Sequence, residues 1–189
     1  MKKVIGLDIS SSTVGWAIIS YDDSFYKLEE YGHIKPLKSS KGSLSVRSAD
    51  YLDKIVEFLS DKSPDSVAIE AYANKFSKGR STARTIIVLS VFNEVTSIGC
   101  LKSLGFEPAR YAVISIRSVL SKIANKKISS KEDAFNFIVE NFDSFKLRKK
   151  KTGTLKDECF DEADAIAVAL THIYKELDNG KGFNLQRIS

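Results

Sequence analysis

The order of apolar segments along the chain constrains its fold more than any other feature of the sequence. Three apolar runs come first, at 3–9, 14–21 and 26–37, and only a few polar residues separate them. Such short links favour antiparallel hairpins, so we expect a three-stranded meander. Further along, helical spacing alternates with short apolar runs, which is typical of a sheet covered by helices. The sequence predicts an α/β fold with a mixed five-stranded sheet flanked by helices.

The rest of the chain supplies that alternation. The expected elements are a helix over 46–59, a strand over 66–70, a helix over 81–104, a strand over 110–115, a helix that begins after Ser129 or Ser130, and a helix over about 158–177. Pro64 and Gly105 stand where the first two helices should end, because proline cannot continue a helix and glycine readily adopts the terminating conformation. We expect one domain over 1–178, followed by a polar tail over 179–189.

Acidic residues stand at three separate places, each at the end of an apolar run or near the start of a helix. Asp8 follows the first run, Glu70 ends SVAIE, and Asp161 and Asp164 lie one turn apart on the last expected helix. If the strands of Asp8 and Glu70 are adjacent and parallel, both carboxylates emerge at the same edge of the sheet. A helix packed across that edge would complete a cluster of four carboxylates.

Such a cluster implies cations, since like charges in one place repel unless they are neutralised. Carboxylate oxygens are hard ligands that suit Mg²⁺ or Mn²⁺ rather than zinc. Two such ions, about 4 Å apart, could activate water and stabilise the leaving oxygen of a phosphodiester. Simpler roles stay open for two residues: Asp8 could cap the turn made by its neighbouring serines, and Asp161 could complement the helix dipole.

Basic residues lie next to these acids in the sequence. The net charge is +5, which suits a polyanionic partner but is weak evidence alone. Residues 146–151 read KLRKKK and come shortly before the last helix. A basic rim beside a metal site would grip phosphates, so we expect Lys149, Lys150 and Lys151 to contact DNA. A solvated run of like charge is the alternative.

Aromatic and basic residues are mixed between Glu70 and the long helix, where the chain reads AYANKFSKGRSTAR. Aromatic rings can stack on bases while the cations contact phosphates. The candidate DNA contacts here are Tyr72, Lys75, Phe76, Lys78, Arg80 and Arg84. Core filling is the alternative for the two aromatic residues.

Three motifs in order, IGLDISSSTVGWAII, VAIEAY and DEADAIAVALTH, resemble the RuvC family of Holliday-junction resolvases. That family belongs to the RNase H-like nuclease superfamily, so the resemblance implies an RNase H-like fold. It also implies a metal-dependent crossover junction endodeoxyribonuclease that nicks two strands of a four-way DNA junction symmetrically. Asp8, Glu70, Asp161 and Asp164 are then the catalytic, metal-binding carboxylates, with Mg²⁺ as the ion, Mn²⁺ as a substitute, and two ions per active site.

The resemblance extends to positions outside the acidic motifs. Arg117, Lys126, Lys127 and Lys131 match basic positions of the family, although this chain reads LSKIANKKISSKED where the family usually has a Gly-rich stretch. Lys131, expected near a helix N-terminus, is our candidate for a catalytic contact to phosphate. His172 lies two turns beyond Asp164 and could support the metal ligands from behind.

The helix expected over 81–104 is apolar on more than one stripe. One stripe could pack on the sheet and another on a second subunit, and the resemblance likewise implies a homodimer. A helix fully buried in a monomer is the alternative. The first apolar run is too short for a membrane span or a signal peptide, so we expect a cytoplasmic protein that contacts no membrane.

Three functions compete on this sequence. The first is the junction resolvase, acting in DNA recombination and repair. The second is a related RNase H-like nuclease with broader activity on branched DNA or on RNA strands. The third is a small domain of the actin or sugar-kinase type that binds a nucleotide, although that fold normally needs two such domains and a second phosphate motif.

Overall fold

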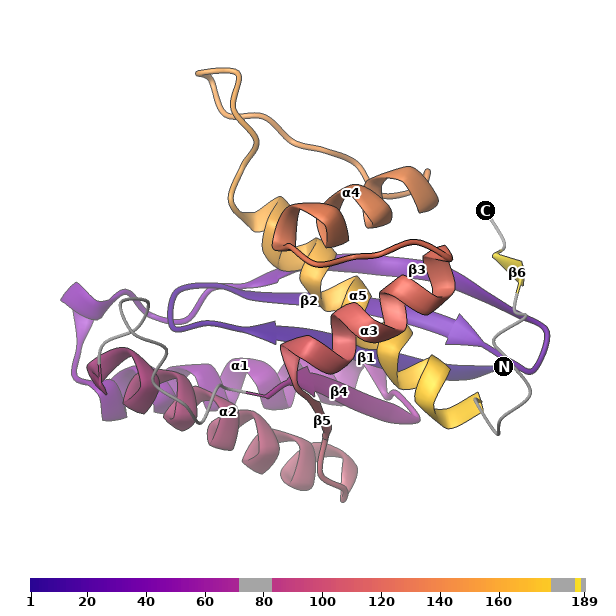
Figure 1. Ribbon diagram of the computed structural model, residues 1–189. Helices are drawn as coiled ribbons and strands as arrows, with labels where there is room; N and C mark the ends of the chain where they lie inside the picture. The colour runs from indigo at the N-terminus through magenta and orange to yellow at the C-terminus, as the bar shows by residue number, and fades with distance from the viewer. Residues whose placement is uncertain (72–82, 178–185, 188–189) are drawn as a thin grey trace.

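A single mixed sheet organises the computed structural model, which describes residues 1–71, 83–177 and 186–187 (Figure 1). Its strand order is β5-β4-β1-β2-β3-β6. The strands are β1 (Lys2–Ile9), β2 (Val14–Tyr21), β3 (Phe25–Ile34), β4 (Ser66–Glu70), β5 (Ala109–Tyr111) and β6 (Gln186–Arg187). The first three form the predicted antiparallel meander, and β4 and β5 extend the sheet in parallel from β1. The five predicted strands are present, and the two-residue β6 joins β3 from within the segment expected to be a polar tail.

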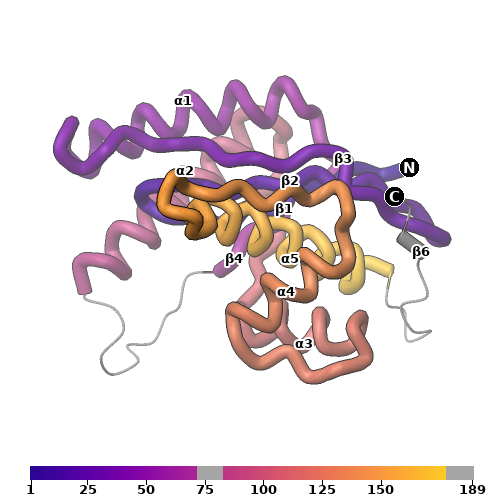
Figure 2. Tube along the Cα trace, turned by 90° about the horizontal axis from the view of Figure 1, so that it is seen from above, coloured from indigo at the N-terminus to yellow at the C-terminus, as the bar shows by residue number. Residues whose placement is uncertain are grey.

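Helices cover both faces of this sheet. They are α1 (Leu44–Lys62), α2 (Ala83–Leu104), α3 (Val113–Ala124), α4 (Lys131–Asn141) and α5 (Glu158–Leu177), with a short 3₁₀ turn, η1, at Ser39–Lys41. Figure 2 shows α1 and α2 on one side of the sheet and α3, α4 and α5 on the other. Of these, α5 lies directly against the sheet and α4 packs outside it (Figure 1).

The helix boundaries follow local signals in the sequence. Ser43 caps α1 by accepting a hydrogen bond from the backbone N–H of Val46. The helix ends at Ser63, which takes a left-handed conformation with φ 43°, just before Pro64. Gly105 ends α2 in the same way, with φ 80°. The predicted stops at Pro64 and Gly105 are therefore confirmed.

The strand expected over 110–115 is wrong beyond Tyr111. The chain leaves the sheet there, and α3 begins at Val113, a helix that the sequence reading did not separate from the strand. The buried residues of α3 are Ile116, Val119 and Leu120, at helical spacing. Short apolar runs cannot be assigned to strand or helix by periodicity alone, which is why the boundary was missed.

Alternation along the strands divides the core into two layers. On β1, Ile5 belongs to the layer beneath α1 and α2, whereas Val4 belongs to the layer beneath α5. Ala68 of β4 lies in the α5 layer as well. Because side chains alternate with a period of two, Asp8 and Glu70 also lie on the face that α5 covers.

Candidate active site

Asp8 and Glu70 emerge side by side at one edge of the sheet. Strands β1 and β4 are parallel neighbours, and their register pairs Leu7 with Ile69. The next residue of each strand is therefore Asp8 and Glu70. The topology brings together two carboxylates that lie more than sixty residues apart in the sequence.

Two glycines let α5 cross this edge at very short range. A Cβ atom at Gly6 would lie 2.2 Å from the backbone oxygen of Ala165, and one at Gly15 would lie 2.1 Å from that of Asp161. Any larger residue would push the helix away from the sheet. This close approach carries Asp161 and Asp164, in the first turns of α5, to the end of β1.

The turn after β1 is closed without help from Asp8. The Ser10 hydroxyl donates to the backbone oxygen of Thr13 at 2.6 Å and accepts from the Thr13 N–H at 3.0 Å. It also accepts from the Ser12 N–H at 3.3 Å. The simpler role considered for Asp8, capping this turn, is thus filled by Ser10.

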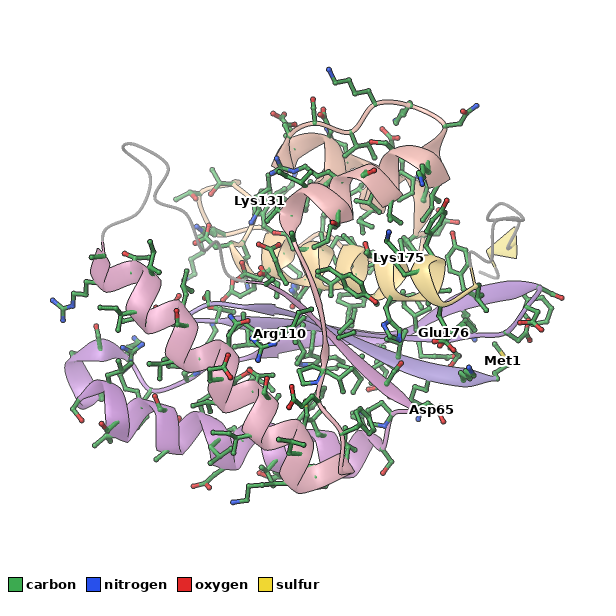
Figure 3. The ribbon with its side chains drawn as sticks, turned by 60° about the horizontal axis from the view of Figure 1, so that its bottom comes forward. Met1, Asp65, Arg110, Lys131, Lys175 and Glu176 are labelled. Carbon is green, nitrogen blue, oxygen red and sulfur yellow. The ribbon has the colours of Figure 1, made fainter. Side chains whose placement is uncertain are left out.

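A pocket of about 140 Å³ lies at this edge. Its polar lining consists of Asp8, Glu70, Asp164, Lys131 and Arg117. Lys131 is the first residue of α4, and its Nζ atom lies 2.6 Å from Oδ2 of Asp164. Figure 3 shows Lys131 near the N-terminal part of α5. The pocket therefore combines three carboxylates with two cations, each from a different element.

A capping box fixes where α4 begins. The Ser130 hydroxyl accepts from the backbone N–H of Asp133 at 3.0 Å, and the Asp133 carboxylate accepts from the backbone N–H of Ser130 at 2.9 Å. Hydrogen bonds from Ser129 and Ser130 lower the pKa of Asp133 to about 2. This cap places Lys131 in the first turn, where it reaches Asp164.

The electrostatics of the four carboxylates are unfavourable at neutral pH. Burial, followed by repulsion from Asp164, raises the pKa of Glu70 to about 7. Burial, with a smaller contribution from Asp164, raises the pKa of Asp161 to about 6. The pKa of Asp8 is well above its ordinary value because of burial and the charges of Asp164, Glu70 and Asp161, in that order. Lys131 opposes these shifts, but the pKa values stay raised, because four acids share the site with only the two cations of the pocket.

The donor set fits a hard divalent cation. All four candidate ligands offer carboxylate oxygens, which Mg²⁺ and Mn²⁺ prefer. Across residues 1–71 and 83–177, no three His, Cys, Asp or Glu side chains are close enough to form a ready-made metal cage. The ammonium group of Lys131 instead holds one oxygen of Asp164. A cation would have to displace that ammonium group or share Asp164 with it.

The other predicted DNA contacts on α3 and after it are dispersed. Arg117 lines the pocket and donates to the backbone oxygen of Ser129 at 3.1 Å. Lys126 forms an exposed ion pair with Glu140, and Lys127 is exposed. These two lysines follow the C-terminal end of α3 and do not line the pocket.

Lys149, Lys150 and Lys151 lie on a small hairpin before α5. Lys149 pairs with Leu155 in an isolated antiparallel bridge, and Lys150 Nζ lies 2.9 Å from the carboxylate of Asp157. All three lysines are exposed. Figure 1 shows this segment, in orange, rising from the body of the molecule between α4 and α5.

Arg84 is exposed at the start of α2, beside a second and larger cavity of about 1080 Å³. Basic and hydroxyl side chains dominate its lining, which includes Lys35, Lys38, Arg47, Ser11, Ser12, Thr13, Ser39, Ser40 and Ser43. No Asp or Glu of the described part of the chain lines it. The remaining predicted contacts of this region, Tyr72, Lys75, Phe76, Lys78 and Arg80, lie outside the described residues.

His172 does not line the acidic pocket. Its Nδ1 atom lies 3.0 Å from the Tyr111 hydroxyl, and its Nε2 atom lies 3.4 Å from Glu176. Eight residues of helix separate it from Asp164, which corresponds to about 12 Å along the axis. Burial lowers the pKa of His172. The structure therefore places this histidine with Tyr111 rather than with the candidate metal ligands.

Sequence reasoning missed Glu162, the residue between Asp161 and Ala163. Its side chain is fully buried, and it contacts His33 of β3 and Arg148 of the basic hairpin. The residue belongs to the four-residue sequence DEAD at the start of α5, but nothing in the local sequence says which of these acidic residues faces the interior. His33 lies 129 residues away in the sequence and Arg148 lies 14 residues away, across a hairpin, so no helical or strand periodicity pairs them with it.

The chain is similar to individual proteins of known function, although no protein-family model matches it. The crossover junction endodeoxyribonuclease RuvC of Ehrlichia ruminantium (strain Gardel) is 28% identical over 178 residues, covering 90% of this chain and 96% of the relative. RuvC of Finegoldia magna is 25% identical over 173 residues, covering 91% of this chain and 93% of the relative. The chain resembles the RuvC family.

Solved structures agree on the fold. RuvC from Thermus thermophilus in complex with a Holliday junction substrate aligns with a TM-score of 0.68 at 15% identity, covering 94% of this chain and 97% of that one. The yeast mitochondrial Holliday junction resolvase Ydc2 aligns with a TM-score of 0.61 at 15% identity, covering 89% and 76%. The predicted RNase H-like fold and the resemblance to RuvC are both confirmed.

Proposed function

We propose that this chain is a RuvC-like crossover junction endodeoxyribonuclease, which resolves four-way DNA junctions by paired symmetric nicks. The observation that carries the proposal is the excess negative charge at the carboxyl ends of β1 and β4, where four carboxylates have raised pKa values. A protein does not keep such a cluster for stability, because repulsion and desolvation both oppose it. Near-full-length similarity to RuvC gives the cluster its chemical meaning.

Asp8, Glu70, Asp161 and Asp164 would hold the metal, with Mg²⁺ as the preferred ion, Mn²⁺ as a substitute, and two ions per site. Bound divalent cations would lower the pKa of water and stabilise the leaving oxygen of the phosphodiester. The protein's part is to hold its four carboxylates on rigid elements, two strand ends and one helix. If a cation took its place on Asp164, Lys131 would be free to contact the phosphate that is cut.

Basic side chains around the pocket would bind the phosphates of the DNA. Arg117 stands at the pocket itself, and Lys149, Lys150 and Lys151 stand on the exposed hairpin. On the other side of the site, Arg84 and the cavity without carboxylates offer a second path for a phosphate backbone. Lys126 and Lys127 do not line the pocket, so we expect them to contact DNA outside the cut site. Tyr72, Lys75, Phe76, Lys78 and Arg80 are proposed from the sequence alone as further DNA contacts.

A homodimer through α2 suits a substrate with two equivalent cut sites. One face of α2 packs on α1, where the Tyr51 hydroxyl lies 2.9 Å from Thr96. Another face leaves Ile87, Ile98 and Leu101 46% to 59% exposed.

By length and composition α2 is also the one helix of the described residues that could cross a membrane, with 33% of its most apolar window buried. Its close packing on α1 favours a second subunit, within an intracellular enzyme, as the partner of the exposed face.

The decisive experiment uses a labelled four-way junction, a replication fork, an RNA–DNA hybrid and a linear duplex, each with Mg²⁺, Mn²⁺ or chelator. The proposal expects paired symmetric nicks confined to the junction, only with metal. Equal cutting of forks or RNA–DNA hybrids would instead establish the broader nuclease. Binding without cutting under every metal condition would contradict the active site proposed here.

Sedimentation of the wild type and Ile98→Asp in parallel would test the dimer, which this substitution should dissociate.

A further inference from the structure

Glu162 is a completely buried carboxylate whose two oxygens have different partners. Oε1 lies 2.9 Å from Nδ1 of His33, and Oε2 accepts a hydrogen bond from the Arg148 guanidinium. Since an ionised carboxylate only accepts hydrogen bonds, His33 donates through Nδ1. Glu162 is 0% exposed, whereas the side chains of His33 and Arg148 are 28% and 38% exposed. The buried charge is therefore fully paired, and its partners reach it from the surface.

The sheet register explains why Glu162 meets His33. Asp8 pairs with Gly15 across β1 and β2, and Gly15 pairs with His33 across β2 and β3. Directly opposed residues of an antiparallel pair lie on the same face, so this row runs across the sheet beneath α5. The helix touches the row at Gly15, where the backbone of Asp161 and Glu162 comes closest. Asp161 acts on Asp8 at one end of the row, and Glu162 binds His33 at the other.

Arg148 is the first residue of the basic hairpin, which we define as residues 148–156. Its backbone oxygen accepts from the Lys156 N–H at 2.8 Å, which closes the base of the hairpin. The Lys150 N–H donates to Thr154 at 2.7 Å further up. Residues 149–154 are all exposed. Leu155, next to the base of the hairpin, packs against the core, so the base is where the hairpin is held to the domain.

We propose that Glu162 is a positioning residue that fastens the basic hairpin, through Arg148, to the turn of α5 that carries Asp161. His33 holds the same carboxylate from β3, so the turn is tied to the sheet and to the hairpin at one point. The consequence for DNA rests on the proposed function: the lysines of the hairpin stand at a fixed place beside the cut site. Without the Arg148 contact, the same lysines would sample many positions and would bind phosphates with a larger loss of entropy.

Amide hydrogen exchange of the full chain tests the fastening itself. We expect Glu162→Gln and Arg148→Gln to speed exchange of the bonded amides of the hairpin, those of Lys150, Gly153 and Lys156, by about tenfold. Amides of α5 beyond residue 163 exchange through global unfolding, so they should speed up only by the fall in the free energy of unfolding, which urea unfolding measures separately. Glu30→Gln is the matched control, because it removes the carboxylate of a β3 ion pair, with Lys62, on the same strand as His33. Arg148→Gln keeps Glu162 paired with His33, so it tests the idea even where Glu162→Gln folds poorly.

Junction binding in the absence of divalent metal tests the consequence. Both variants should weaken binding about tenfold while all hairpin lysines remain, and Glu162→Gln should add little in a Lys149, Lys150 and Lys151 triple alanine background. Unchanged hairpin exchange would overturn the proposal, as would an equal acceleration of the hairpin amides in the Glu30→Gln control. Faster exchange of the hairpin amides together with wild-type affinity for the junction would also overturn it. If the wild type fails to bind junctions, the proposed function falls, and the exchange data alone decide whether the hairpin is fastened.

Discussion

Asp161 and Glu162 are neighbours in the chain, yet they belong to acidic groups of opposite charge balance. Asp161 lies with Asp8 and Asp164, where burial and mutual repulsion raise the pKa values. Glu162 is more deeply buried, but each of its oxygens has its own donor. One residue of helix rotation separates a group with fewer cations than carboxylates from a carboxylate whose two oxygens are both paired.

The difference teaches how to distinguish a functional acid from a structural one. Burial alone does not do so, since Glu162 is the more buried of the two. The balance of charge does distinguish them. A buried structural carboxylate is stable only when its partners are present, whereas a metal ligand lacks a sufficient counter-charge until the metal ion binds. Four experiments test this contrast.

The largest effect is expected from Asp8→Asn. An amide is a poorer ligand for a hard cation than a carboxylate, so cleavage of a four-way junction should fall by about 10³-fold or more. Junction binding should be unchanged or tighter, because one charge that repels phosphate is gone. The measurements are single-turnover cleavage and a gel shift. A folded variant that no longer binds would contradict a purely catalytic role for Asp8.

Isosteric amides at the two neighbouring positions should change stability in opposite directions. Glu162→Gln removes the negative charge that faces Arg148 and leaves one acceptor oxygen for two donors, so it should lower the free energy of unfolding by about 2 kcal/mol. Asp161→Asn removes a carboxylate whose charge is unfavourable in the fold, and should raise it by about 1 kcal/mol at pH 7.5 without metal. Urea unfolding measures both. The contrast fails if the two substitutions shift stability in the same direction.

Removal of the hairpin charge should act on binding alone. Alanine at Lys149, Lys150 and Lys151 together should weaken junction binding about tenfold at moderate salt and reduce the salt slope by up to about 3. The single variant Lys175→Ala serves as the control, since this lysine is exposed and lies in the last turn of α5, at the other end of the helix from the hairpin. An unchanged slope in the triple variant would make the hairpin a bystander.

The smallest expected effect is a dependence of stability on pH and metal. Burial raises the pKa of Glu70 from 4.5 to about 7, so its protonation favours the folded state. Its contribution is complete below pH 4.5 and is lost as pH rises through about 7. In chelator, Tm should therefore fall by about 3 °C between pH 6 and pH 8, and Mg²⁺ should restore it at pH 8. Glu70→Gln should flatten the pH curve; an equal slope in that variant would assign the effect to other groups.

Much of the fold was readable from local signals. The meander, the mixed sheet, the ends of α1 and α2 and the start of α4 all follow from short links, periodicity, Pro64, Gly105 and Ser130. The boundary between β5 and α3 was not readable, because an apolar run of a few residues fits either period. His172 shows the same limit at the site: a shared helix face suggested a role near Asp164, but eight residues of helix separate the two.

The sequence by itself determined which carboxylates stand at the ends of strands and in the first turns of a helix, and it placed Lys131 at a helix start. Those positions depend on residues that are close in the sequence. Only the tertiary structure decided that Asp161 shares the charge of Asp8 while Glu162 is paired with His33 and Arg148. The reason is physical: the pairing depends on strand register and on the approach of α5 over Gly6 and Gly15, which joins residues more than a hundred positions apart.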